Sequence, residues 1–167
     1  VHRIIHGCFD LALENHWIRF NPTQNVMRLY PANVPERQPY TKEQENLLLN
    51  FVKNDGTYYI YYPLIICFLE TMLRASEMFG LTWSNIDFIN NTITVDHQVL
   101  YTRYEGKYQF IASKVKTKAG NRVIPLTQRA KKAFLYQRKQ QISLNRQPTI
   151  QVGSYSDFVF TTRSGRP

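Results

Sequence analysis

The stretch from Thr71 to Asp87 reads TMLRASEMFGLTWSNID, and it constrains the fold more than any other part of the chain. Within it, Arg74 stands among apolar residues, and a guanidinium in such surroundings needs a partner that offsets its desolvation. Glu77 follows three residues later and can supply a carboxylate on the same helical face. The pair predicts either an ordinary surface ion pair or an arginine preset to stabilise charge on a phosphoryl group, and spacing alone favours neither.

Helical patterns lie on the N-terminal side of this stretch. Thr41 and Gln44 form a capping-box pattern, which predicts a helix that begins there. We expect the buried face of this helix to consist of Leu47, Leu48, Phe51 and Val52. A second helix, which starts near Thr57 or with Pro63 as its first residue, is expected to run through Leu73 as a deeply buried element.

The first forty residues have a different character. Residues 1–17 carry an apolar stripe at helical spacing, which predicts a face for a partner surface and consists of Ile5, Cys8, Phe9, Ala12 and Leu13. Prolines at positions 31, 35 and 39 then punctuate a polar stretch that suits a semi-extended linker. We therefore expect a boundary there, with residues 1–30 before a Pro-rich linker (31–40) and the main domain at 41–167.

The pattern changes to that of β-strands after Ile86. Three short runs separated by turn residues predict a small antiparallel meander, and they are Thr92–Val95, Tyr108–Ile111 and Arg122–Ile124. Thr127 can cap a further helix at about 128–144, with Ala130, Ala133 and Phe134 facing inward. A last strand is expected near residues 158–160. The fold class is therefore α+β, mainly helical with a small antiparallel sheet.

The positive charge of the chain is concentrated in one segment. Residues 103–146 contain twelve Lys or Arg and one acid, so the net charge of this segment is +11. The rest of the chain has a net charge of −2, which gives the total of +9. Such segregation is typical of proteins that bind polyanions, because each neutralised phosphate releases condensed counterions. A solvated basic face without a partner is the alternative.

Several other classes of protein are disfavoured. Cys8 and Cys67 lie far apart with no His cluster nearby, which argues against a disulfide framework and a zinc site and favours a cytoplasmic setting. His2 and His6 could in principle bind a metal, but no third ligand accompanies them. The apolar stretch 58–73 is interrupted and too short for a membrane span, and no nucleotide-binding motif is present. We expect neither a cofactor nor a membrane association.

Two sequence motifs, which follow one another along the chain, resemble those of a known family. The pattern T-x-L-R-x-S-E-x-x-x-L-x-W-x-x-I-D resembles the signature around the first catalytic arginine of tyrosine recombinases, in particular the integrases of phages and conjugative transposons. Forty-two residues after Arg74, the sequence KTKAGNRVIPL at 116–126 is similar to the β-hairpin that carries the catalytic lysine of that family. Residues 1–22 resemble the last helices of the family's core-binding, DNA-clamping domain, so the resemblance covers nearly the whole chain.

The resemblance implies roles for three residues. Arg74 would contact the scissile phosphate, Glu77 would support the active-site architecture, and Lys116 would protonate the departing 5′ oxygen. Nearby basic residues are expected to contact the DNA backbone, and these are Lys114, Lys118, Arg122, Lys131 and Lys139. The chain departs from the family at Met72, where glycine is usual, and at Asn85, where aspartate is common.

The function implied is site-specific recombination of double-stranded DNA through a 3′-phosphotyrosyl intermediate, which requires neither ATP nor a metal. The full-length protein would act as a homotetramer on DNA, in the cytoplasm of a bacterial cell and at its nucleoid. The family's His-x-x-Arg box and nucleophilic tyrosine are not found up to Pro167, so we expect the chain to be a fragment that binds DNA without cutting it. The alternative is a non-enzymatic basic DNA-binding module.

Overall fold

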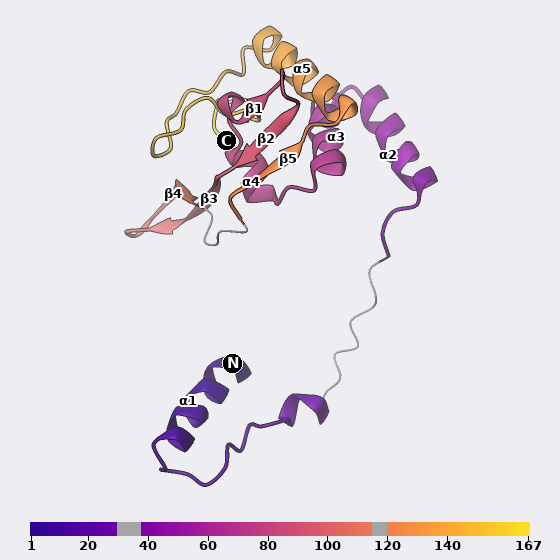
Figure 1. Ribbon diagram of the computed structural model, residues 1–167. Helices are drawn as coiled ribbons and strands as arrows, with labels where there is room; N and C mark the ends of the chain where they lie inside the picture. Colours follow the sequence, from indigo (N-terminus) through magenta and orange to yellow (C-terminus); the bar gives the residue numbers. More distant parts are fainter. Residues whose placement is uncertain (30–37, 115–119) are drawn as a thin grey trace. The chain divides into compact units, whose positions relative to one another are not determined.

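The computed structural model describes residues 1–29, 38–114 and 120–167, and the chain divides into two compact units, Val1–Tyr40 and Thr41–Pro167 (Figure 1). The first unit contains helix α1 (His2–Glu14) and the short 3-10 helix η1 (Val26–Leu29). Asn21 ties the intervening turn to α1, because its Nδ2 donates to Asp10 Oδ1 at 2.7 Å. No residue of α1 is buried, so the apolar stripe lies uncovered within its own unit. Most of the expected linker, residues 30–37, lies outside the described residues, and the core-binding assignment of residues 1–30 stays a prediction.

The second unit begins with α2 (Lys42–Asn54), and the predicted capping box is confirmed. Thr41 Oγ1 accepts from the backbone N–H of Gln44, and Gln44 Oε1 accepts from that of Thr41 at 2.9 Å. The predicted buried face is wrong in part, since Leu47 and Phe51 are 69% and 57% exposed.

The face of α2 that is turned inward is fixed by a polar contact as well as by apolar ones. Leu49 and Val52 are buried, and Glu45, four residues before Leu49 on the same face, accepts from Arg129 Nη1 at 2.9 Å. Because Arg129 belongs to another helix, this ion pair and the two apolar residues rotate α2 away from the expected orientation.

A 3-10 helix, η2 (Tyr58–Tyr61), leads directly into α3 (Tyr62–Thr71), which has Pro63 in its first turn and buries Ile66 and Cys67. Helical structure therefore begins near Thr57 as a 3-10 turn, and the α-helix begins at Tyr62, one residue before the predicted Pro63. The helix ends at Thr71 rather than Leu73, because Met72 adopts a left-handed conformation with φ 52° and ψ 28°. Glycine is the residue that favours this conformation, which explains physically why the resembling motif usually has glycine at this position.

The strands form two separate sheets rather than the single meander that we predicted. One sheet has the order β1-β2-β5, with β1 (Ile86–Asp87), β2 (Thr92–Val95) and β5 (Arg122–Pro125). The other is a hairpin of β3 (His97–Tyr104) and β4 (Lys107–Lys114). After Val95 the chain leaves the first sheet, and β3 and β4 pair only with each other. The chain then returns to the first sheet as β5, which pairs with β2.

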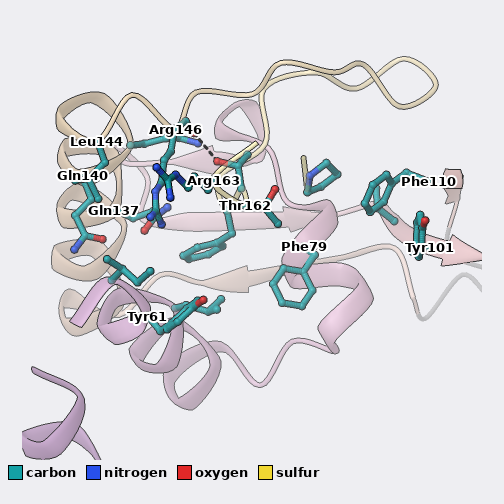
Figure 2. Close-up of a pocket in the computed structure, with 17 residues that line it drawn as sticks. Tyr61, Phe79, Tyr101, Phe110, Gln137, Gln140, Leu144, Arg146, Thr162 and Arg163 are labelled. Atoms are coloured by element: carbon teal, nitrogen blue, oxygen red, sulfur yellow. Dashed lines mark hydrogen bonds between the residues drawn. The ribbon is translucent and has the colours of Figure 1, made fainter. Parts of the chain in front are cut away.

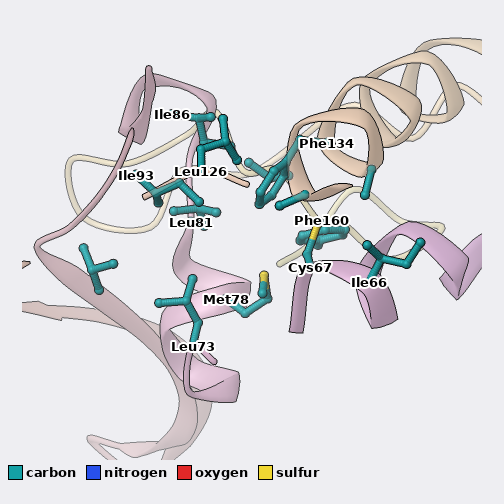
Figure 3. Close-up of a cluster of buried hydrophobic side chains, with 14 of the residues drawn as sticks. Ile66, Cys67, Leu73, Met78, Leu81, Ile86, Ile93, Leu126, Phe134 and Phe160 are labelled. Atoms are coloured by element: carbon teal, nitrogen blue, oxygen red, sulfur yellow. The ribbon is translucent and has the colours of Figure 1, made fainter. Parts of the chain in front are cut away.

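Helix α5 (Gln128–Ser143) is capped by Thr127, whose Oγ1 accepts from the backbone N–H of Ala130, as predicted. Figure 3 shows Phe134 of this helix pointing into the main core, which also contains Ile93 of β2 and Met78, and all three side chains are 0% exposed. Residues 158–160 are buried but form only a single bridge, between Phe158 and Thr82, instead of the predicted strand. Their carbonyl groups accept from glutamine side chains of α5, which takes the place of a sheet partner.

The α+β prediction is confirmed: helices α2, α3 and α5 accompany two small antiparallel sheets, of which the β3–β4 hairpin projects away from these helices (Figure 1). Within the described residues, no helix is long and apolar enough to cross a membrane.

Candidate active site

Helix α4 (Ala75–Gly80) places the two residues of the central motif. Arg74 is its N-cap, with extended backbone angles of φ −66° and ψ 152°, and Glu77 occupies the third helical position. The Glu77 carboxylate folds back over the helix start, where Oε2 accepts the backbone N–H of Arg74 at 2.9 Å and Oε1 accepts from its Nη1 at 2.9 Å. This is the reciprocal half of a capping box, so the same interaction begins the helix and orients the arginine.

A second arginine approaches Glu77 from β5. Arg122 opens this strand and pairs across the sheet with Val95. Its guanidinium binds the carboxylate through two hydrogen bonds, from Nη1 to Oε1 at 3.0 Å and from Nη2 to Oε2 at 2.9 Å. This bidentate arrangement has the planar fork geometry that gives strong and well-oriented pairs between arginine and carboxylate.

Glu77 is thus the buried centre of the cluster. Its side chain is 2% exposed, and its two oxygens together accept four hydrogen bonds, which fill the acceptor sites of a carboxylate. Hydrogen bonds from Arg122 are the largest cause that lowers the pKa of Glu77, from 4.5 to about 2, against the opposing effect of burial. The reciprocal hydrogen bonds raise the pKa of Arg122. Glu77 is therefore a fixed negative charge rather than a proton donor.

The cluster has one positive charge in excess, because two arginines share one carboxylate. Arg74 is its open side, with a side chain that is 74% exposed, whereas that of Arg122 is 29% exposed. The premise that Arg74 is the desolvated group is therefore wrong. The desolvated group is Glu77, whose carboxylate accepts hydrogen bonds from the guanidinium groups of Arg74 and Arg122. Among the described residues, only Nη1 of Arg74 is engaged, so its Nε and Nη2 donors remain available for an anion.

The expected lysines are distributed over different parts of the unit. Lys116 and Lys118 lie outside the described residues, and Lys114 is exposed at the end of β4. Lys131 donates from Nζ to the carbonyl oxygen of Phe88 at 2.6 Å and to Asn91 Oδ1 at 2.8 Å, so it fastens the β1–β2 turn to α5. Lys139 is exposed on α5, which Figure 1 shows along the upper edge of this unit, whereas the β3–β4 hairpin projects at its lower left. The described basic residues of segment 103–146 are therefore divided between the β3–β4 hairpin, β5 and α5.

An apolar groove of about 470 Å³ lies elsewhere in the unit (Figure 2). Its walls include Phe79 of α4, Tyr101 and Phe110 of the hairpin, and Leu144 after α5. Gln140 also lines it, and its Nε2 is buried without a hydrogen-bond partner among the described residues. The last residue, Pro167, forms part of the same wall. An unsatisfied buried donor in an apolar groove favours an occupant that brings a hydrogen-bond acceptor.

Neither a metal site nor a cysteine site competes with this cluster. The described part of the chain has no group of three or more His, Cys, Asp or Glu side chains that could hold an ion. His2 and His6 both bond to Thr23, which closes the turn after α1. Burial raises the pKa of the Cys67 thiol, which leaves it protonated and unreactive.

Sequence reasoning found Arg74 and Glu77 but missed two parts of the arrangement. It assigned Arg122 to the DNA backbone and did not predict its contact with Glu77, because the two are 45 residues apart and no spacing rule joins them. It also gave no role to Asn85, which accepts from Thr82 and donates from Nδ2 to Asp96 Oδ1 at 3.2 Å. An aspartate there could not make this donation, which accounts for the departure from the resembling motif.

A protein-family model and several known proteins match the sequence of this chain. The model of the phage integrase family matches residues 39–167. The transposases from transposon Tn916 of Enterococcus faecalis and from transposon Tn1545 of Streptococcus pneumoniae are each 34% identical over 169 residues, which cover 99% of this chain and 40% of each relative.

Solved structures of the Tn1549 transposon integrase are also similar. One, in complex with a circular intermediate DNA, matches with a TM-score of 0.88 at 29% identity, and another, in complex with transposon right end DNA, matches with a TM-score of 0.87. Both matches cover 99% of this chain and 51% of that chain. The chain therefore spans about half, or less, of the length of these relatives. The motif around Arg74, the matched family model and the shared fold together lead to one conclusion: this chain belongs to the phage integrase family of tyrosine recombinases.

Proposed function

We propose that this chain is part of a site-specific recombinase that breaks and rejoins DNA strands through a 3′-phosphotyrosyl intermediate. The observation that supports this most is the Arg74–Glu77–Arg122 cluster, which orients an exposed arginine through its Nη1 and keeps one positive charge in excess. A scissile phosphate carries a single negative charge that must be met as its phosphorus becomes five-coordinate. A preset guanidinium stabilises that charge without reorganising during the reaction.

In the proposed reaction, a tyrosine oxygen attacks the phosphorus and the bond to the 5′ oxygen breaks. Arg74 contacts the non-bridging oxygens, and Glu77 holds Arg74 in place. Lys116 donates a proton to the departing 5′ oxygen, which leaves as a hydroxyl group. The 5′ hydroxyl of a second strand then attacks the phosphotyrosyl bond and releases the tyrosine. The phosphodiester bond energy is conserved in the covalent link, so this route uses neither ATP nor a metal.

The sequence of the chain supports the role of Lys116, although its position lies outside the described residues. Covalent continuity keeps it within two residues of Lys114, the end of β4, and within six of Arg122, which contacts Glu77. A lysine is suited to the task because it is both a cation and a proton donor.

The proposed function also assigns the basic residues near the phosphate site to contacts with DNA. Lys114, Lys118 and Arg122 flank the proposed phosphate site in sequence and would bind the duplex that is cut. Lys139 is exposed on α5 and would reach DNA beyond the hairpin, whereas the ammonium group of Lys131 is already bonded to Phe88 and Asn91 and would contribute less. A homotetramer on two duplexes, which we propose for the longer protein at the bacterial nucleoid, would bring a second stretch of DNA close.

The remaining catalytic groups would belong to that longer protein. We propose that it supplies the nucleophilic tyrosine and a second arginine, and that part of it fills the apolar groove beside Pro167 and accepts a hydrogen bond from Gln140 Nε2. Residues 1–167 alone are then expected to bind DNA without cutting it.

The alternative is a DNA-binding module without catalysis, in which the basic residues only grip the duplex. The geometry favours the enzyme, because a buried carboxylate with four hydrogen bonds is more than backbone binding requires. Exposed lysines such as Lys114 would suffice for affinity alone.

A nicked suicide substrate separates the two possibilities. A longer chain that contains this sequence and a downstream His-x-x-Arg box with its tyrosine is expected to form a protein–DNA adduct that survives detergent. Residues 1–167 should bind the substrate without forming an adduct. The Arg74→Ala variant of the longer chain should keep its affinity for DNA and lose the adduct. DNA binding by the longer chain with no adduct under any condition would favour the non-enzymatic module.

A further inference from the structure

A buried histidine lies at the other end of α4 from the proposed phosphate site. His97, the first residue of β3, is 3% exposed, and its Nε2 lies 2.7 Å from the carbonyl oxygen of Gly80, the last residue of α4. Because a carbonyl oxygen can only accept, Nε2 is the donor in this bond. The imidazole thus satisfies a carbonyl group that the end of the helix would otherwise leave without a partner.

Other groups fix the ring itself. Asp96 Oδ1 lies 2.6 Å from Nδ1 and also accepts from Asn85 Nδ2 at 3.2 Å. Tyr155 stacks on the ring face, with centroids 3.5 Å apart and planes inclined by 9°. Hydrogen bonds at the ring edge and stacking on the ring face therefore fix the orientation of the imidazole, as expected for a side chain that positions its neighbours.

Strand β3 contacts α4 along its length. At the start of the helix, Ser76 Oγ donates to Gln98 Oε1 at 2.9 Å. At its end, a Cβ atom on Gly80 would lie 2.9 Å from the backbone nitrogen of Val99, so only glycine permits this close approach. Arg74 and Glu77 therefore stand on a six-residue helix whose position is set by the first three residues of β3.

The same residues of β3 also position the lysine-bearing end of the hairpin. His97 pairs in register with Lys114, and Gln98 pairs with Ser113. Gln98 Nε2 also donates to Ser113 Oγ at 3.2 Å. His97 and Gln98 thus contact α4 with their side chains and the end of β4 through the strand pairing. Lys116 follows that end by two residues.

We propose that His97 is a positioning residue that holds the Arg74–Glu77 helix in register with the lysine-bearing end of β4, so that both can act on one phosphate. The inference rests on the proposed recombinase function. His97 touches no reacting atom itself, and it acts through the Gly80 carbonyl on one side and the pairing with Lys114 on the other. Without its donor, α4 is free to shift relative to β4, and a shift of about 1 Å is sufficient to lower a rate up to about a hundredfold.

Three variants separate hydrogen bonding from packing. His97→Phe keeps a ring that can stack on Tyr155 but removes both nitrogens. His97→Gln keeps an amide N–H at the same number of bonds from the backbone, which can still donate to Gly80. Phe134→Leu serves as a control for lost stability, because Phe134 is a fully buried core residue of α5 whose side chain forms no hydrogen bond.

The first measurement uses the 167-residue chain and needs no DNA. NMR of arginine-labelled protein should show slowly exchanging guanidinium protons of Arg74 and Arg122, bonded to Glu77. His97→Phe should shift or broaden the Arg74 signals, whereas His97→Gln and Phe134→Leu should leave them in place. Unchanged Arg74 signals in a folded His97→Phe variant would overturn the proposal.

The second measurement uses the longer chain and the suicide substrate. At saturating DNA, His97→Phe should lower the rate of adduct formation by about tenfold or more with unchanged affinity, and His97→Gln should restore most of the rate. A rate for His97→Phe equal to that of Phe134→Leu would also overturn the proposal. If the unmodified longer chain forms no adduct, the recombinase function fails, and the NMR result still decides whether His97 positions Arg74.

Discussion

At the scale of single residues, Glu77 is the group on which the site depends. Its carboxylate is 2% exposed and stays ionised because two arginines surround it, and each arginine in turn takes its orientation from this carboxylate. Removing one partner of such a buried pair leaves the other charge without compensation, which is why we expect the cluster to respond as a unit.

The depressed pKa of Glu77 predicts a pH dependence of stability. A carboxyl group with a pKa of about 2 in the folded state and 4.5 when unfolded contributes stability that is complete above about pH 4.5 and is lost as the pH falls towards 2. The full contribution is on the order of 3 kcal/mol, of which about 2 kcal/mol is lost by pH 3. Urea unfolding at pH 7 and pH 3 should show the free energy of unfolding of Glu77→Gln falling less than that of the unmodified chain. The same loss in both proteins would mean that the carboxylate is not held in this way.

The sequence predicted the contact between Arg74 and Glu77, because residues three apart at the start of a helix are neighbours. It could not predict that Arg122 completes the cluster. That contact depends on β5 pairing with β2 rather than with β4, which no local pattern encodes.

At the scale of elements, local signals were predicted well and pairings were not. The caps at Thr41 and Thr127 both follow from the chemistry of neighbouring residues. The separation of the hairpin from the β1-β2-β5 sheet was not foreseen, and neither was strand β3, whose outer half is exposed and lacks an alternating pattern.

The end of α3 offers a test at this scale. Met72 is left-handed with φ 52°, and its side chain is 79% exposed, so it contributes little packing and strains the backbone. Met72→Gly is expected to stabilise the chain by about 1 kcal/mol, since glycine adopts this conformation without a steric cost. Thermal unfolding should show a Tm higher by roughly 3–5 °C. Met72→Ala keeps the Cβ atom and should give no gain, so an equal rise in both variants would point to a cause other than backbone strain.

At the scale of the whole molecule, the described basic residues of one sequence segment are divided among separate elements of the second unit. The +11 charge of residues 103–146 was read from the sequence, but its division between the β3–β4 hairpin and α5 requires the fold. Proximity in sequence therefore does not by itself bring these charges to one duplex.

Salt dependence of DNA binding measures how many of them do. Lys114→Ala should reduce the slope of log affinity against log salt by about 0.9, the value for one lost phosphate contact. Lys131→Ala is the comparison, because its ammonium group is already bonded to Phe88 and Asn91, and we expect a smaller change in slope together with lower stability. Equal effects of the two substitutions on the slope would show that the ammonium of Lys131 reaches DNA as readily as that of Lys114.

Arg74, held by Glu77, is proposed to neutralise the charge of the phosphate that is cut. The most direct measurement is adduct formation by the longer chain on two substrates, one with the natural scissile phosphate and one with a methylphosphonate, which has no negative charge at that position. Arg74→Ala is expected to be inactive on the phosphate and to regain adduct formation on the methylphosphonate, because the charge that the arginine would neutralise is already absent. An Arg74→Ala variant that is equally impaired on both substrates, or fully active on the natural phosphate, would contradict this account.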